Sequence, residues 1–245
     1  MTRDNQNSSN TLFLSQGTNA LTSTKQGLLH YWDLGGTTDI TDKHGNLDLT
    51  NSSCTTSSGG APDSGDCVAM TATQYLDRAS FVTELVSTWS IQVWFLLDSI
   101  TSLTNQLMSH RSGAGDRHWQ VLYDNEATDL MRVATSSDGT NFDSDASHAE
   151  DKALATWFHV VGTCDGTTIN QYLDGNATPV ATDTFAGLGS SDAAFAIGTS
   201  AASKGTATVG HAGRVFAFGI WGRALTTAEV STLYNSGSGL RYAAL

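Results

Sequence analysis

The feature that most constrains this chain is an alternation of apolar and polar residues on both sides of an Asp-Gly pair, between Trp157 and Asp174. Asp-Gly is the pair that suits a two-residue type I′ turn between antiparallel strands. Pairing Cys164 with Thr167 sets a register in which the two faces of the hairpin differ. One face carries Phe158, Val160, Cys164, Ile169 and Leu173, and the other carries Trp157, His159, Thr163, Thr168, Asn170 and Tyr172. The first face predicts a buried core, with Cys164 as a small buried hydrophobe.

Other short runs predict further strands, at 28–34, 67–70, 75–76, 89–98, 106–111, 118–124, 129–135 and 213–221. In the run from Trp89, every second residue is apolar, which is typical of a strand with one buried face. Only 15% of the residues are charged, and Ser, Thr and Gly are abundant, as in proteins with many strands and turns. We find no internal repeat and no linker. The sequence therefore predicts one all-β domain over residues 27–245, a two-sheet antiparallel β-sandwich, preceded by an extended polar N-terminal arm over residues 1–26.

A single short helix is predicted near the C-terminus. Thr226 and Glu229 have the spacing of a capping box, and Leu225 and Val230 have the spacing of a hydrophobic staple. The pattern ends near Tyr234, before Asn-Ser-Gly. Two turns of helix are not stable alone, so we expect this helix to pack against the sandwich.

Charge and hydropathy exclude several classes of partner. The net charge of −12 would repel nucleic acid and anionic membranes, and basic runs are absent from the sequence. The sequence contains no stretch of about 18 apolar residues, so it predicts no membrane-spanning helix. The N-terminus lacks the basic start and apolar core of a signal peptide, so we expect no export by that route.

Several motifs, in this order, resemble one family. They are the Leu-His-Tyr-Trp-Asp-Leu run ending at Leu34, the turn from Asp42 to Asn46, Trp89-Ser-Ile-Gln-Val-Trp, Trp157-Phe-His-Val-Val, Asp165-Gly-Thr-Thr, Tyr172-Leu-Asp-Gly, Ile197-Gly-Thr, Gly213-Arg-Val, and Trp221-Gly-Arg-Ala-Leu-Thr-Thr-Ala-Glu-Val with Leu233-Tyr-Asn. Over residues 27–236 the chain is similar to the laminin-G-like, concanavalin A-like jelly-roll domains, which include the pentraxins. This resemblance implies two packed sheets of about six or seven strands each. It also implies binding of glycans or proteins, often with calcium at the rim of the sandwich.

Catalytic motifs are missing from the sequence. The four glutamates, Glu84, Glu126, Glu150 and Glu229, do not form the paired-carboxylate strand pattern of the glucanases that share this architecture. A Gly-x-Ser-x-Gly elbow and a Cys-x-x-Cys pair are absent, and the histidines are scattered. We therefore predict a protein that is not an enzyme.

Two loops offer oxygen ligands for calcium, the one cofactor that the sequence leaves open. Residues 38–46 contribute Asp39 and Asp42, and residues 137–145 contribute Asp138, Asp143 and Asp145. The alternative is that these residues only form turns. Arg214 argues against calcium, because relatives usually carry an acidic residue at that point of the motif.

The cysteines leave one disulfide open. Cys54 and Cys67 flank a loop rich in Ser and Gly and could close it. The sequence does not give the distance between their Cα atoms, on which a bridge depends.

For carbohydrate binding, the candidate residues are Trp119, Trp157, Tyr172 and His159, because sugar rings stack on exposed aromatic side chains. The alternative for each is a place in the core, where most tryptophans of a sandwich lie.

These observations predict a non-enzymatic virion protein, such as a phage capsid decoration, head-fibre or tail protein. The polar arm has too little apolar surface to fold alone, and its one apolar island, Leu12, Phe13 and Leu14, would anchor it to other virion subunits in an oligomer or larger assembly. The jelly roll would then face outward and bind host-surface glycans. The alternative is a secreted or surface carbohydrate-binding module of a bacterium, and a glycoside hydrolase is a distant third.

Overall fold

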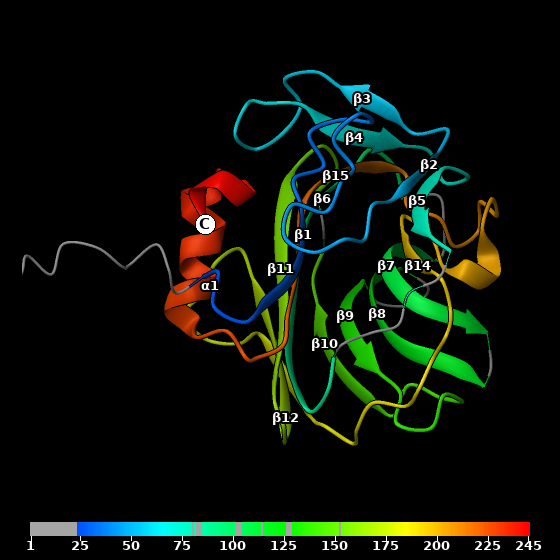
Figure 1. Cartoon of the computed structure of the whole chain (residues 1–245), viewed down its shortest axis with the longest axis vertical. Helices are drawn as coiled ribbons and strands as arrows, with labels where there is room; N and C mark the ends of the chain where they lie inside the picture. Colours follow the sequence, from blue (N-terminus) through cyan, green and yellow to red (C-terminus); the bar gives the residue numbers. More distant parts are fainter. Residues whose placement is uncertain are drawn as a thin grey trace, which may run out of the picture.

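Two antiparallel sheets pack face to face in the computed structural model (Figure 1), which describes residues 24–79, 81, 85–100, 104–113, 115–125, 129–151 and 153–245. The first sheet runs in the order β13-β12-β11-β6-β15-β4-β3, with β1 also paired to β15. Its strands are β1 (Leu28–Trp32), β3 (Thr55–Ser57), β4 (Cys67–Met70), β6 (Thr88–Leu97), β11 (Trp157–Asp165), β12 (Thr168–Leu173), β13 (Ala181–Thr184) and β15 (Gly213–Trp221).

The second sheet runs in the order β10-β9-β8-β7-β14-β5-β2. Its strands are β2 (Thr50–Ser52), β5 (Tyr75–Arg78), β7 (Thr104–Gly113), β8 (Asp116–Asp124), β9 (Leu130–Thr135), β10 (Ser144–Ala149) and β14 (Phe195–Ile197). The sandwich predicted from the sequence is therefore confirmed, with eight and seven strands among the described residues.

The main core fills the space between the sheets. The ring of Trp32 stacks on that of Phe218, with centroids 5.0 Å apart, and Phe195 stacks on both. The predicted core face of the β11–β12 hairpin, from Phe158 to Leu173, belongs to this cluster. Cys164 is fully buried in it, as expected.

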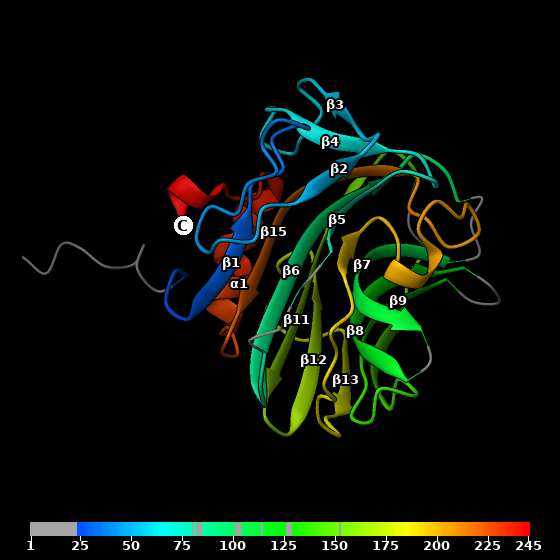
Figure 2. The ribbon, with the colours of Figure 1, turned by 45° about the vertical axis from the view of Figure 1, so that its right-hand side comes forward.

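A second apolar cluster lies on the outer face of the eight-stranded sheet. Helix α1 (Thr227–Tyr234) and the C-terminal residues lie against this face, as Figure 2 shows. Among the cluster's buried members are Trp94, Phe216, Val230 and Leu233. The described residues also form three short 3-10 turns, η1 (Ala201–Ser203), η2 (Asn235–Gly237) and η3 (Tyr242–Ala244), of which the last two follow α1.

The start of α1 confirms the predicted cap. The Thr226 side chain accepts a hydrogen bond from the Glu229 backbone N–H at 3.3 Å, and the Glu229 carboxylate accepts one from the Thr226 N–H at 2.8 Å. Leu225 and Val230 are both buried in the second cluster, so the short helix packs against the sandwich as expected. It ends at Asn235, which has the left-handed conformation, with φ 48°.

The hairpin register differs from the prediction by two residues. Cys164 pairs with Ile169 and not with Thr167. The carboxylate of Asp165 accepts hydrogen bonds from the N–H groups of Thr167 and Thr168, both at 2.9 Å, so Asp165 caps the turn from its edge. A shift of two residues leaves every side chain on its predicted face.

The disulfide is not formed, because Cys54 and Cys67 are both buried free thiols. Cys67 lies opposite Ser57 in the pairing of β3 with β4, and Cys54 precedes Ser57 by three residues in the chain. At about 3.3 Å per residue, that is beyond the reach of a disulfide. The two thiols also belong to different apolar clusters.

The apolar island Leu12, Phe13 and Leu14 and most of the predicted arm lie outside the described residues. The chain is described from Thr24, whose carbonyl accepts a hydrogen bond from the Trp221 indole at 2.7 Å. Among the described helices, none has the length and apolar character that crossing a bilayer requires.

Candidate functional site

The aromatic residues proposed for sugar stacking are mostly buried. Trp119 lies between the sheets, with its ring 5.7 Å from that of Phe195. His159 and Tyr172 lie under the second cluster, on the predicted mixed face, and burial lowers the pKa of His159 to about 3. The stacking prediction is therefore wrong for these three residues: Trp119 lies in the core between the sheets, and α1 with the C-terminal residues covers the outer sheet face at His159 and Tyr172. Trp157 is half-buried, and its indole N–H donates to the Gly60 carbonyl at 3.0 Å.

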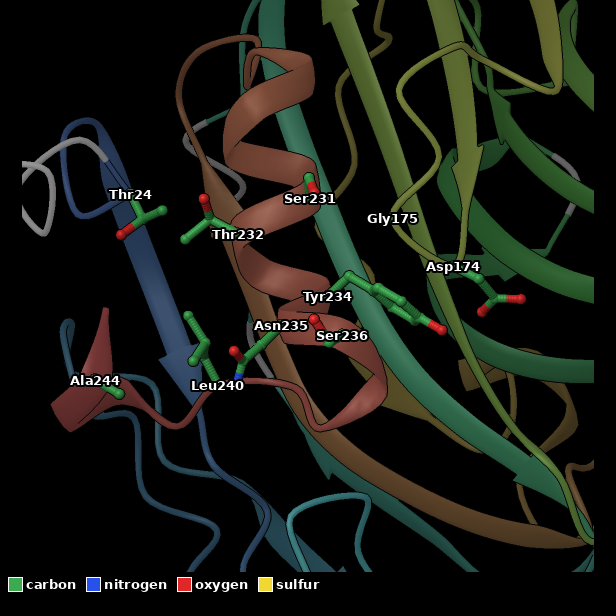
Figure 3. Close-up of a pocket in the computed structure, with 10 residues that line it drawn as sticks. All are labelled: Thr24, Asp174, Gly175, Ser231, Thr232, Tyr234, Asn235, Ser236, Leu240 and Ala244. Atoms are coloured by element: carbon green, nitrogen blue, oxygen red, sulfur yellow. The ribbon is translucent and has the colours of Figure 1, made fainter.

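A pocket of about 640 Å³ surrounds the C-terminal end of α1. We call it the helix-end pocket; it is lined by Thr24, Asp174, Gly175, Ser231, Thr232, Tyr234, Asn235, Ser236, Leu240 and Ala244. Figure 3 shows Thr24, Leu240 and Ala244 on one side of the helix end, with Asp174 and Gly175 on the other. The side chain of Tyr234 extends toward Asp174.

Tyr234 is held in place by aromatic stacking. Its ring lies parallel to that of Trp94, with centroids 5.4 Å apart and an interplanar angle of 3°, and it also stacks on His159 at 6.1 Å. Burial and then the charge of Asp174 raise the pKa of Tyr234, so its phenol stays protonated. Gly175 has φ +69°, and a Cβ there would lie 2.6 Å from the Tyr234 Cβ, so this contact requires glycine.

The polar groups of the pocket are also fixed by hydrogen bonds. Asp174 directly follows β12, and its carboxylate accepts a hydrogen bond from the His159 backbone N–H at 2.8 Å. The Asn235 amide N–H donates to the Gly239 carbonyl at 2.9 Å. With the hydroxyls of Ser231 and Ser236, the pocket combines a half-buried aromatic ring with carboxylate, amide and hydroxyl groups. Polar groups at fixed positions around apolar surface can orient a small polar ligand.

A buried chain of hydrogen bonds ties the pocket wall to the sheet. The Tyr31 hydroxyl donates to the Leu240 carbonyl at 2.6 Å and accepts from the Gln92 amide at 3.1 Å. The carbonyl oxygen of that amide lies 2.7 Å from Nε2 of His159, which therefore carries the hydrogen. Burial raises the pKa of Tyr31 and so keeps its donor in place. Through this chain the position of Leu240 depends on β1, β6 and β11.

The predicted calcium ligands are engaged by other partners. In the loop between β1 and β2, Asp39 pairs with Lys43. Both oxygens of Asp42 accept hydrogen bonds, from the backbone N–H groups of Tyr31, His44, Gly45 and Leu47 and from Nδ1 of His30. Burial would raise the pKa of Asp42, but these hydrogen bonds lower it to about 2. Asp42 therefore organises its own loop.

The second loop behaves in the same way. Asp138 accepts from the Thr140 N–H at 2.7 Å, Asp143 accepts from the Ser137 N–H at 3.0 Å, and Asp145 pairs with Arg132. Within the described ranges, no three His, Cys, Asp or Glu side chains are grouped to hold a metal ion. The turn-forming alternative accounts for Asp42, Asp138 and Asp143, while Asp39 and Asp145 form ion pairs, so the structure does not support the calcium prediction.

Sequence reasoning missed Tyr234, Asp174 and Asn235 as a group. Each belongs to a motif that the sequence shows, the end of the helix or the Tyr-Leu-Asp-Gly turn. Their meeting depends on where α1 packs against the sheet. One indication of that packing is present in the sequence, because a helix of two turns is not stable alone and must pack against the sandwich.

Comparison with solved structures gives several similar folds. Domain 4 of AbnA, an extracellular GH43 arabinanase from Geobacillus stearothermophilus solved in complex with arabinotriose, is 16% identical, with a TM-score of 0.60 over 84% of this chain and 97% of that domain. The binding domain of Paraclostridial Mosquitocidal Protein 1 is 13% identical, with a TM-score of 0.62 over 87% of this chain and 53% of that one. A mutant of Trypanosoma rangeli sialidase with trans-sialidase activity is 14% identical, with a TM-score of 0.59 over 89% of this chain and 34% of that one.

At these identities the likeness shows the fold alone, and the chain spans about half of the mosquitocidal binding domain and a third of the sialidase. No curated protein matches the sequence. The Laminin_G_3 family model, described as the concanavalin A-like lectin/glucanases superfamily, matches residues 69–231. That match covers more than half of the chain, from β4 into α1, so the protein belongs to the concanavalin A-like lectin/glucanase superfamily.

Proposed function

We propose that this domain binds a neutral carbohydrate in the helix-end pocket. The observation that carries the proposal is the ring of Tyr234, fixed on Trp94 and His159 beside the carboxylate of Asp174 and the amide of Asn235. Sugars offer hydroxyls for hydrogen bonding and C–H faces for aromatic contact, and this lining offers the matching partners. The similarity in fold to an arabinanase domain solved with arabinotriose supports the same ligand class.

We infer binding without hydrolysis. Hydrolysis of a glycosidic bond ordinarily uses two carboxyl groups flanking that bond. Asp174 is the one carboxylate among the residues that line the helix-end pocket. Glu229 is held by the Arg223 guanidinium and the helix cap, so it already has a structural role. Release of reducing sugar from any polysaccharide, abolished by one Glu or Asp substitution, would overturn this inference.

Calorimetric titration of the full chain tests the site. The ligands are neutral oligosaccharides, with arabinotriose as the first, and the variants are Tyr234→Ala and Asp174→Asn. We expect each variant to weaken binding by about tenfold, which is about 1.4 kcal/mol. Asp174→Asn keeps the oxygen that accepts from His159, so its fold is retained. Tyr75→Ala, which removes a half-buried tyrosine from the other sheet, is the matched control.

Wild-type affinity in both pocket variants would show that the sugar binds elsewhere. A panel on which no neutral sugar binds would refute the proposed function itself.

Display of this module on a virion stays a prediction from the sequence. It depends on residues 1–26 as an anchor, and residues 1–23 lie outside the described part of the chain. A secreted or surface module of a bacterium stays the alternative setting, and the proposed pocket serves either one.

A further inference from the structure

Two arginines share one face at the end of the β7–β8 hairpin. Arg111 and Arg117 are partners in the register of these strands, so their side chains lie on the same side of the sheet. An Arg111 Nη1–H donates to the side-chain oxygen of Gln120 at 2.9 Å. Gln120 alternates with the core residues Trp119 and Val121 along β8, so this face points away from the sandwich core.

No carboxylate pairs with either of these arginines among the described residues, although the chain carries twice as many acidic as basic residues. Six other basic side chains of the described structure do have a carboxylate within 4 Å: Lys43, Arg132, Lys204, Arg214, Arg223 and Arg241. Asp116, next to Arg117 in sequence, accepts instead from the hydroxyls of Ser112 and Ser191. The positive charge at this place is therefore not neutralised by the described part of the protein.

The two guanidinium groups also have unused donors. Nε of Arg111 and Nε of Arg117 are both buried and have no hydrogen-bond partner among the residues that the structure describes. Burial, and then the charge of Arg117, lower the pKa of Arg111. Buried donors without partners and uncompensated like charges are both costly. An anion in contact with both guanidinium groups would offset the two like charges.

An aromatic ring lies against the same pair. The guanidinium carbons of Arg111 and Arg117 lie 5.7 Å and 5.4 Å from the centre of the half-buried Phe142 ring, within cation–π range. The loop that carries Phe142 is held to the hairpin, because the Gly139 carbonyl accepts from the N–H groups of Gly115 and Arg117 at 3.0 and 2.9 Å. The three side chains are thus positioned before any ligand arrives.

We propose that Arg111, Arg117 and Phe142 form a binding site for an acidic saccharide, with its carboxylate on the two guanidinium groups and its ring beside Phe142. Guanidinium groups match carboxylates in shape and charge. The proposal rests on the proposed function for its ligand class, but it concerns a different place. The helix-end pocket lies on the outer face of the eight-stranded sheet, and this site lies on the outer face of the seven-stranded sheet.

The test compares two matched ligands by calorimetry on the full chain, trigalacturonate and the neutral galactose trimer with the same linkages. We expect trigalacturonate to bind about tenfold more tightly than the neutral trimer at low salt, and to lose that advantage as NaCl screens the charges. The double variant Arg111→Gln/Arg117→Gln should lose the advantage at low salt. Phe142→Leu should weaken trigalacturonate binding with no change of charge.

The control is Arg78→Gln/Arg214→Gln, which removes the same number of positive charges elsewhere and should bind as the wild type does. Thermal melting of each variant verifies that it folds. Equal binding of trigalacturonate by the wild type and the Arg111/Arg117 variant would overturn the proposal, as would the absence of trigalacturonate binding.

The two proposals can fail separately. Neutral sugars that bind through Tyr234, with no binding of trigalacturonate, would refute only the acidic site. Trigalacturonate that binds through the arginines, with no neutral ligand found, would support the acidic site and refute the helix-end pocket.

Discussion

Asp42 shows how much one carboxylate organises in a loop rich in turn-forming residues. Its side chain is fully buried and accepts five hydrogen bonds from the loop, from Tyr31 and from His30. These bonds outweigh burial and lower its pKa to about 2. The folded state therefore stabilises the charged form, and that contribution is present above the ordinary Asp pKa and is lost as the pH falls toward 2.

We predict that Asp42→Asn lowers the free energy of unfolding by about 2 kcal/mol at pH 7, from a pKa difference of about two units. The difference from wild type should shrink below pH 4, because wild type then loses the same stabilisation. Urea unfolding at pH 7, 4 and 2.5 measures it. Asp66→Asn, at an exposed position, is the control and should change little at any pH. A deficit for Asp42→Asn that does not vary with pH would contradict the assigned role of its charge.

At the scale of elements, α1 depends on its first residues. It has eight residues, fewer than an isolated helix needs, so its cap and its packing must both contribute. We predict that Thr226→Ala costs about 1 kcal/mol of unfolding free energy, because the cap loses the oxygen that accepts from the Glu229 N–H. Thr227→Ala, at the neighbouring exposed position, should cost far less. Equal losses in chemical denaturation would mean that the capping box does not stabilise the helix.

The elements also show what the sequence could predict. Trp89 to Leu97 and the β11–β12 hairpin were predictable, because a period of two and an Asp-Gly turn are local signals. The predicted pairing was two residues off because the Asp165 side chain, through its own hydrogen bonds, moved the centre of the turn by one residue along the chain. The helix-end pocket could not be predicted, since Tyr234 meets Asp174 only after α1 folds back onto the outer sheet face. The same packing buried His159 and Tyr172, which alternation alone had placed on a mixed face.

At the scale of the whole molecule, the described part of the chain forms two apolar clusters and is tied in at its first described residues. Among the described residues, those from Leu28 onward form both clusters, and the chain is tied in at Thr24 and Gly27 by the Trp221 indole and the Gly222 N–H. Stability and attachment should therefore separate along the chain. The arm, with Leu12, Phe13 and Leu14, would serve attachment.

We predict that deleting residues 1–23 shifts the thermal unfolding midpoint by no more than about 2 °C, the shift expected for less than 1 kcal/mol in a chain of this size. Affinity at the helix-end pocket should stay unchanged, and self-association seen by sedimentation velocity should be lost. Replacing Leu12, Phe13 and Leu14 by serine in the full chain should remove association to the same extent, because burial of apolar side chains would drive it.

The matched control for these serine substitutions replaces polar residues of the same arm. Alanine at Ser8 and Ser9 changes the arm without removing any of its apolar island, so association should stay intact. Association that survives both the deletion and the serine substitutions would mean that the jelly roll itself forms the contact, and the anchor prediction would then be wrong.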